Sequence, residues 1–361
     1  MTYVLSHTTA LEAMRLPQFA EALLRREPLD HAPEIPTSKG VSSWERSISS
    51  IAELERPAKF LAYGTSSSRR TPSFEVMSCQ PEPPAGAILQ LAPDTAIVSP
   101  ELLALQMARI ATHLELVLLI CELCGLYAIQ PNSPTGMIQR YRPLTTIDRI
   151  LKFAESLNRT PGTAALRRAC QDSFSCSGSP QESKLSIRCA WKRAAGGYGL
   201  SIVSLNEELE VGRIVGTSGT SRIRKPDLLF RRPSKEVPAI CLDYKGRVHL
   251  DQGRPGADDA RQNELIAAGM RPYTILSEQY QDMDYMDALI DGTIRRDLGL
   301  KTRSVTPERA LLERRRREAL LAELNVIDGL SWGTSCNNPS VVFAKRRVES
   351  ALLAERRARE L

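Results

Sequence analysis

One short stretch, residues 237–246 with the sequence VPAICLDYKG, limits the folds open to this chain more than any other. Its centre, AICL, is apolar at every position rather than at alternate ones, which is typical of a strand buried on both faces inside a sheet. Asp243 and Lys245 follow directly. Residues two apart on a strand point to the same side. The sequence therefore predicts a central strand that presents a carboxylate and an ammonium group together at its end.

The segments around this strand complete an α+β unit over residues 178–300. Ser179 and Pro180 are typical of a helix start, and Glu182 lies in the first turn. Asp227 begins the apolar run DLLF, which we expect on a neighbouring strand. The turn sequence GTSGTS predicts a hairpin, because it lacks the Gly-Lys-Ser/Thr of a phosphate loop. The predicted order, α-β-β-β-α-β-α, is typical of a mixed sheet with helices packed on it.

The segments before and after this unit are predicted to form two further parts of the protein. Residues 1–177 contain short helical and strand patterns, which predict a helical/mixed accessory domain. Residues 301–361 form a basic helical extension, with 13 Lys and Arg against 8 Asp and Glu, in a chain whose net charge is +6. This extension carries four consecutive arginines, Arg314, Arg315, Arg316 and Arg317. Two interpretations stay open for them: a solvated helix with Glu–Arg pairs, or contact with nucleic-acid phosphates.

Composition argues against a membrane or secreted protein. The most apolar run, LELVLLICELCGLY, contains Glu115 and Glu122 and is too short and too charged to span a bilayer. The first residues lack the basic-then-apolar order of a secretory signal. Cys121 and Cys124 form the one C-x-x-C motif and are predicted to be buried thiols. We therefore expect a cytoplasmic protein with no membrane partner.

Three carboxylates and one lysine are the residues that suggest chemistry. Glu182, Asp227 and Asp243 could meet at one edge of the sheet beside Lys245. Mg²⁺ (or Mn²⁺) prefers such hard oxygen ligands, and a bound divalent ion lowers the pKa of a water molecule. A lysine nearby can orient that water and stabilise the charge that develops on phosphate. The alternative for each residue is structural: a strand-start turn, a charge at a helix N-terminus and a lysine at a sheet edge.

Residues 179–300 resemble the PD-(D/E)xK nuclease superfamily, and most closely its branch related to very short patch repair endonucleases. The pieces that carry the resemblance are SPQES, KPDLLF, LDYKGRVHL, DDARQNELIAAG and MRPYTIL. The resemblance implies a restriction-endonuclease-like core. It assigns the metal-binding and catalytic positions to Glu182, Asp227 and Asp243, and the catalytic lysine to Lys245. By the same resemblance His249 and Arg261 would contact nucleic acid.

Lys245 departs from that branch, because many of its members have an acidic residue there, and so matches the wider superfamily better. The first 177 residues are similar, more loosely, to the antitoxins of AbiE-type abortive-infection systems, through YVLSHTTALEAMR and the order FEVMS…LAPDTAIVSPELLALQMAR. Such modules often accompany a winged helix, yet no clear helix-turn-helix pattern is visible here. His7 of this region is predicted to be a capping or packed histidine.

Together these features predict a Mg²⁺-dependent nuclease that hydrolyses nucleic-acid phosphodiesters, with DNA favoured, in phage defence or DNA repair. The alternative is a catalytically inactive nuclease-fold regulator, or a toxin–antitoxin component, that binds DNA or a protein partner.

Overall fold

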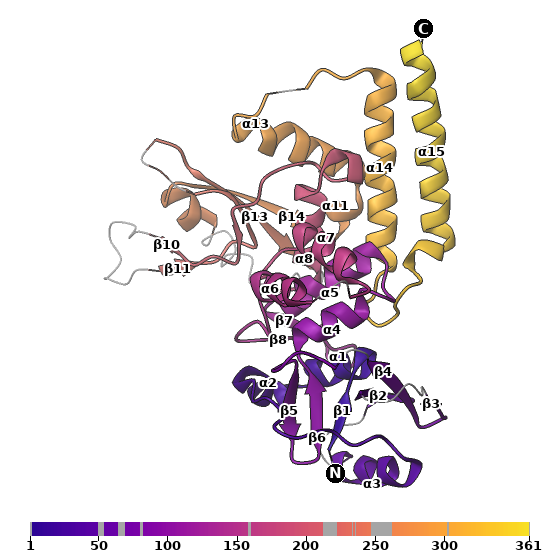
Figure 1. Ribbon diagram of the computed structural model, residues 1–361. Coiled ribbons are helices and arrows are strands. Elements are labelled where there is room, and N and C mark those ends of the chain that lie inside the picture. The colour runs from indigo at the N-terminus through magenta and orange to yellow at the C-terminus, as the bar shows by residue number, and fades with distance from the viewer. Residues whose placement is uncertain are drawn as a thin grey trace.

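The computed structural model shows an α+β protein with mixed sheets, as expected (Figure 1). It describes residues 2–49, 54–63, 69–79, 82–157, 160–211, 222–232, 234, 236–246, 262–301 and 303–360. None of the helices in these ranges combines the length and the apolarity that a bilayer span requires.

The N-terminal part is built on a six-stranded sheet of order β3-β4-β2-β1-β6-β5, in which the pairs β1–β6 and β2–β4 are parallel. Helices α1 and α4 pack against it, and Figure 1 shows this sheet at the N-terminal end of the molecule. The strands are β1 (Tyr3–Leu5), β2 (Ala58–Tyr63), β3 (Arg69–Arg70), β4 (Phe74–Cys79), β5 (Ile88–Ala92) and β6 (Thr95–Val98).

Helices connect β1 to β2 within this sheet, and further helices and a small hairpin follow β6. The pattern TTALEAMRLPQFAEALLRR predicts a helical stretch interrupted at Pro17, and the structure agrees, since α1 ends before Pro17 and a 3-10 turn begins there. These elements are α1 (His7–Arg15), η1 (Pro17–Phe19), α2 (Ala20–Arg25), α3 (Ser38–Ile48), α4 (Pro100–Met107), α5 (His113–Leu123), β7 (Tyr127–Ile129), β8 (Met137–Gln139), α6 (Ile147–Ser156) and α7 (Thr163–Asp172).

Helix α5 is the centre of the first hydrophobic core. Its residues from Leu114 to Leu123 are all buried, and Cys121 and Cys124 are fully buried thiols, as predicted. Burial raises the pKa of Cys121 to about 12, so this side chain stays a neutral thiol at physiological pH. His7 is a packed residue too: its backbone N–H donates to Gln106 and its ring Nδ1 lies 3.1 Å from the Ser6 hydroxyl.

The second sheet has the order β14-β13-β12-β9, with β13 and β14 parallel and the other pairs antiparallel. The hairpin of β10 and β11 projects from the body of the molecule (Figure 1), and its predicted turn, GTSGTS, lies outside the described residues. The elements are α8 (Pro180–Ala190), η2 (Arg193–Ala195), β9 (Ser204–Leu205), β10 (Leu209–Val211), β11 (Arg222–Arg224), β12 (Leu228–Arg231), β13 (Ala239–Lys245) and β14 (Met270–Leu276).

Three segments of this unit that the sequence predicts to be continuous are divided in the structure: the strands LSIVSLNEELEVGRIV and SRIRKPDLLFRR and the final helix EQYQDMDYMDALIDGTIRRDLGL. SRIRKPDLLFRR forms two strands, because Pro226 has no N–H to donate and restricts the residue before it. The predicted final helix is broken at Asp282, whose carboxylate accepts hydrogen bonds from the N–H groups of Asp284 and Tyr285 and so starts a new helix. The pieces are α11 (Ser277–Gln281), α12 (Met283–Met286), the π-helical segment η3 (Asp287–Ile294) and α13 (Arg295–Asp297).

The last part of the chain is an antiparallel helical pair that runs along one side of the molecule (Figure 1). Leu320 and Leu324 of α14 belong to the first core, whereas Leu321 belongs to the second, which surrounds Leu242 and Leu185. The predicted C-terminal extension therefore packs on both of the preceding parts. Its elements are α14 (Pro307–Val326), η4 (Ser335–Asn337) and α15 (Pro339–Glu360).

Gly197 allows the turn after η2 to fold back on α8. A Cβ added there would lie 2.0 Å from the carbonyl oxygen of Trp191, which is backbone and cannot move aside independently. We expect Gly197→Ala to lower the free energy of unfolding by about 2 kcal/mol, through overpacking. Urea denaturation measures this, with Gly292→Ala as the control, because the nearest atom there is 4.0 Å away. Equal midpoints for the two variants would contradict the prediction.

Candidate active site at the end of β13

Helix α8 begins as predicted and positions Glu182. The Ser179 hydroxyl accepts a hydrogen bond from the Glu182 N–H at 3.1 Å, and Pro180 takes the first helical position. The Glu182 side chain is 9% exposed. Its Oε2 accepts hydrogen bonds from the Gly178 N–H at 2.6 Å and from Asn206 Nδ2 at 2.7 Å. The carboxylate is therefore held in one orientation below the surface.

Asp227 and Asp243 face each other across neighbouring strands. In the antiparallel register Leu228 pairs with Leu242, which places the two aspartates opposite each other. Asp243 Oδ1 accepts a hydrogen bond from the Asp227 N–H at 3.2 Å, and Asp227 Oδ2 accepts one from the Tyr244 N–H at 2.6 Å. Asp243 is 8% exposed. Each carboxylate thus holds the other strand's backbone where the strands end.

Glu182 and Asp243 interact electrostatically. Burial raises the pKa of Glu182, and the negative charge of Asp243 raises it further, although the hydrogen bonds from Asn206 and Gly178 oppose the shift. Two buried carboxylates that repel each other attract a cation or a proton. The helix and the central strand therefore bring two of the three predicted carboxylates, Glu182 and Asp243, into electrostatic contact. Asp227 is linked to Asp243 by its backbone N–H, whereas its carboxylate accepts from the Tyr244 N–H.

Lys245 ends β13 in a half-buried position. Alternate residues of this strand enter different cores: Ile240 and Leu242 lie in the second core, and Cys241 lies in a third cluster with Leu265 and Met270. Tyr244 packs edge-on against Tyr280 on the second-core side, with ring centroids 5.8 Å apart. Strand alternation therefore gives Asp243 and Lys245 a common side, as predicted.

The carboxylates do not form a compact three-ligand set. Within the described ranges, no three His, Cys, Asp or Glu side chains lie close enough together to hold a metal ion. Asp227 is engaged with the backbone of Tyr244. The pair Glu182–Asp243 remains. A Mg²⁺ ion that keeps most of its waters requires only one or two carboxylates as ligands. The donor set thus fits a magnesium ion held by two carboxylates better than one held by three.

Two further predicted residues, His249 and Arg261, lie outside the described residues. Asn206, which sequence reasoning missed, holds Glu182 and also donates to the Cys176 carbonyl at 2.9 Å. Its φ of 51° is left-handed, a conformation that asparagine tolerates well. The only signal in the sequence is an asparagine between two short polar segments, which does not distinguish it from an ordinary turn residue.

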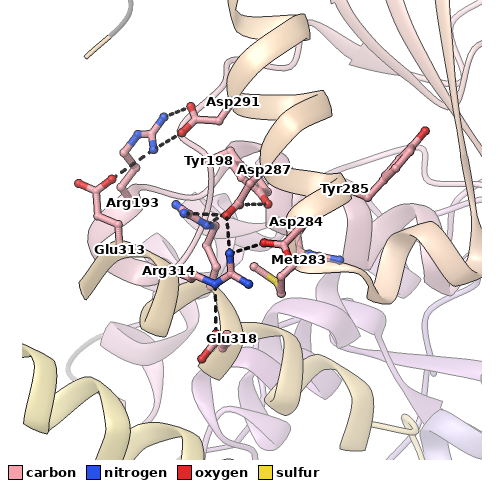
Figure 2. A network of polar contacts seen from close by, with 12 residues as sticks. Arg193, Tyr198, Met283, Asp284, Tyr285, Asp287, Asp291, Glu313, Arg314 and Glu318 are labelled. Carbon is pink, nitrogen blue, oxygen red and sulfur yellow. Dashed lines mark hydrogen bonds and ion pairs between the residues drawn. The ribbon is translucent and has the colours of Figure 1, made fainter. Parts of the chain in front are cut away.

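Three of the four consecutive arginines of α14 form ion pairs, and Figure 2 shows Arg314 within such a network. Arg314 bridges Asp284 and Glu318, Arg315 pairs with Glu318 at 2.7 Å, and Arg317 pairs with Asp287 at 2.9 Å and stacks on Tyr198. These contacts agree with the Glu–Arg pairing expected from the sequence. Arg316 instead lines a groove between α14, α15 and the start of α5.

Comparisons with protein-family models, with curated proteins and with solved structures find no match to this chain.

Proposed function

We propose that the protein is a metal-dependent nuclease that hydrolyses nucleic-acid phosphodiester bonds at the end of β13. The observation that carries this proposal is the buried pair Glu182–Asp243: burial raises the pKa of Glu182, and the charge of Asp243 adds to that shift. Two carboxylates held below the surface supply the hard oxygen ligands that a divalent cation such as Mg²⁺ prefers. Lys245, two residues beyond Asp243, adds the ammonium group that such chemistry uses.

Each residue has a distinct part in this proposal. Glu182 and Asp243 would hold Mg²⁺ or Mn²⁺, which when bound polarises phosphate and lowers the pKa of water. Asn206 and the Gly178 N–H keep the Glu182 carboxylate in position. Asp227 fixes the end of β13 by accepting from the Tyr244 N–H. Lys245 would orient the attacking water and stabilise negative charge on the phosphoryl oxygens.

DNA is the favoured substrate. The exposed side chains Arg346, Arg356 and Arg357 on α15 contribute to the basic surplus of the C-terminal region. Such exposed cations attract a phosphate backbone without reading its sequence. The paired arginines of α14 are not required for this role.

Cleavage assays with plasmid, single-stranded DNA and RNA test the proposal directly. We expect the wild type to cleave at least one of them with Mg²⁺ or Mn²⁺ and to be inactive in EDTA. Lys245→Met should lose at least about 100-fold of the rate, because it lacks the charge that stabilises the transition state. Lys225→Met is the matched control, since Lys225 is exposed and pairs with Glu208 at 2.8 Å. Equal cleavage by wild type and Lys245→Met would assign the activity elsewhere.

A second function, a non-catalytic regulator or toxin–antitoxin component on the nuclease fold, is favoured by one observation. The Asp227 carboxylate accepts a hydrogen bond from backbone, which is a structural role that needs no metal. This alternative predicts DNA or protein binding with no cleavage under any metal condition. Gel-shift measurements on the same substrates distinguish the two functions.

A further inference from the structure

A small cavity lies away from the carboxylate site, on the other side of the first turn of α8. It has a volume of about 200 Å³. Its walls come from α5, β7, α8 and the loop after α14, and they include the apolar side chains Leu118, Ile129, Ile327 and Trp332. An apolar cavity of about 150 Å³ is large enough to bind benzene. The space therefore suits a ligand with one aromatic ring or a comparable aliphatic body.

One cation, Lys184, lies in the wall of this cavity. Its Nζ donates a hydrogen bond to the Ile327 carbonyl at 2.9 Å. Burial lowers the pKa of Lys184 to about 8, against the attraction of Asp328. No carboxylate of the described residues lies within ion-pair distance of it. Asp328, which attracts Lys184 from farther away, accepts hydrogen bonds from the N–H groups of Leu330 and Ser331, each at 2.8 Å. An ammonium group removed from water in this way is stabilised by an anion placed beside it.

Two carboxylates, Glu122 and Asp328, also line the cavity, and Glu122 is already neutralised. Both of its oxygens accept hydrogen bonds from Arg15, at 2.8 and 2.7 Å, and Oε1 also accepts one from the Ile129 N–H at 3.0 Å. The same guanidinium donates to the Gly329 carbonyl at 2.8 Å, which holds the loop that closes the cavity. Asp328 is held by the backbone N–H groups of Leu330 and Ser331, so Lys184 is the charged group in the wall that an anionic ligand could pair with.

We propose that this cavity binds a small carboxylate with an apolar body, such as a one-ring aromatic acid. The carboxylate would pair with the Lys184 ammonium group, and the ring would lie against Ile129 and Trp332. The site is separate from the proposed nuclease function and does not depend on it.

Fluorine NMR titrations with 4-fluorobenzoate and with neutral 4-fluorobenzyl alcohol test the proposal on the full chain. We expect the wild type to bind the acid at least tenfold more tightly than the alcohol at pH 7. Lys184→Met should remove this preference, whereas Lys192→Met, at an exposed lysine outside the cavity, should keep it. No binding of the acid to wild type, or equal binding to wild type and Lys184→Met, would overturn the proposal.

The affinity of the wild type for the acid, measured as a function of pH, tests the proposal even if Lys184→Met does not fold. The other titratable groups that line the cavity are Glu122, Tyr127 and Asp328. The pKa values of Glu122 and Asp328 lie below the usual range and that of Tyr127 lies well above it, so none of these changes charge between pH 7 and pH 9.5. The affinity for the acid should fall by about tenfold per pH unit above pH 9 as Lys184 loses its proton. A constant affinity over this range would contradict the assignment.

Discussion

Replacing Asp243 with asparagine should lower the rate of Mg²⁺-dependent cleavage by about a thousandfold. The carboxamide oxygen can still accept the hydrogen bond from the Asp227 N–H, so the end of β13 keeps its geometry. What is lost is the negative charge that would hold the metal beside Glu182. Metal stabilisation of a phosphoryl transition state is worth several kcal/mol, and about 1.4 kcal/mol corresponds to tenfold in rate.

The control for Asp243→Asn is Asp282→Asn, a second Asp-to-Asn change in the same part of the chain. Asp282 starts α12 by accepting two backbone hydrogen bonds, and asparagine caps helices equally well. Its cleavage rate should match that of wild type. Asp243→Asn should also lower the pKa of Glu182, because the charge that helps to raise it is gone, and carboxyl-carbon NMR measures that change. Full activity in Asp243→Asn would exclude the site.

Replacing Glu122 with glutamine should lower the free energy of unfolding by about 3–5 kcal/mol. Glu122 is 1% exposed and pairs with Arg15, which is 6% exposed. The glutamine is isosteric but neutral, so the change leaves the Arg15 guanidinium buried without a counter-charge. Urea denaturation at pH 7 measures the difference. The control is Glu21→Gln, at an exposed pair with Arg25, where we expect less than about 0.5 kcal/mol.

The effect of Glu122→Gln should also depend on pH. Burial alone would raise the pKa of Glu122, but the charge and hydrogen bonds of Arg15 outweigh burial and lower it. A carboxyl group with a lowered pKa in the folded state stabilises the protein at pH values above its unfolded pKa of about 4.3. That stabilisation is lost as the pH falls through the folded value. The difference between wild type and Glu122→Gln should therefore shrink in acid, and a difference unaffected by pH would contradict this account.

Local patterns predicted most of the second sheet and the starts of several helices. AICL is a central strand, and Ser179 and Pro180 open a helix, because these signals depend on residues close together in sequence. Strand alternation also predicted that Asp243 and Lys245 lie on the same side of β13. The strands β1 and β2 were missed, since their short apolar runs are equally typical of buried helix.

Side-chain partners distant in sequence could not be predicted. The position of Glu182 depends on Asn206, and the Arg317–Asp287 pair joins α14 to η3. The two residues of each pair are far apart in the sequence, so the periodicity of a helix or strand does not indicate that they meet. The hydrogen bond that the Tyr244 N–H donates to the Asp227 carboxylate is likewise a consequence of the strand register, which places Asp227 opposite Asp243. The candidate site residues could therefore be predicted from the sequence, whereas the contacts that hold them in place could be seen only in the structure.

The two-sided packing of α14 has a consequence for the order of folding on the ribosome. Leu320, Leu324 and Ile327 complete a core whose other members are mostly made more than a hundred residues earlier. Contacts that distant in sequence form late, after a large loss of chain entropy. Until synthesis has passed residue 327, the part of this core that α14 covers, beside helix α8, therefore stays exposed to water. During that interval it is a natural substrate for chaperones.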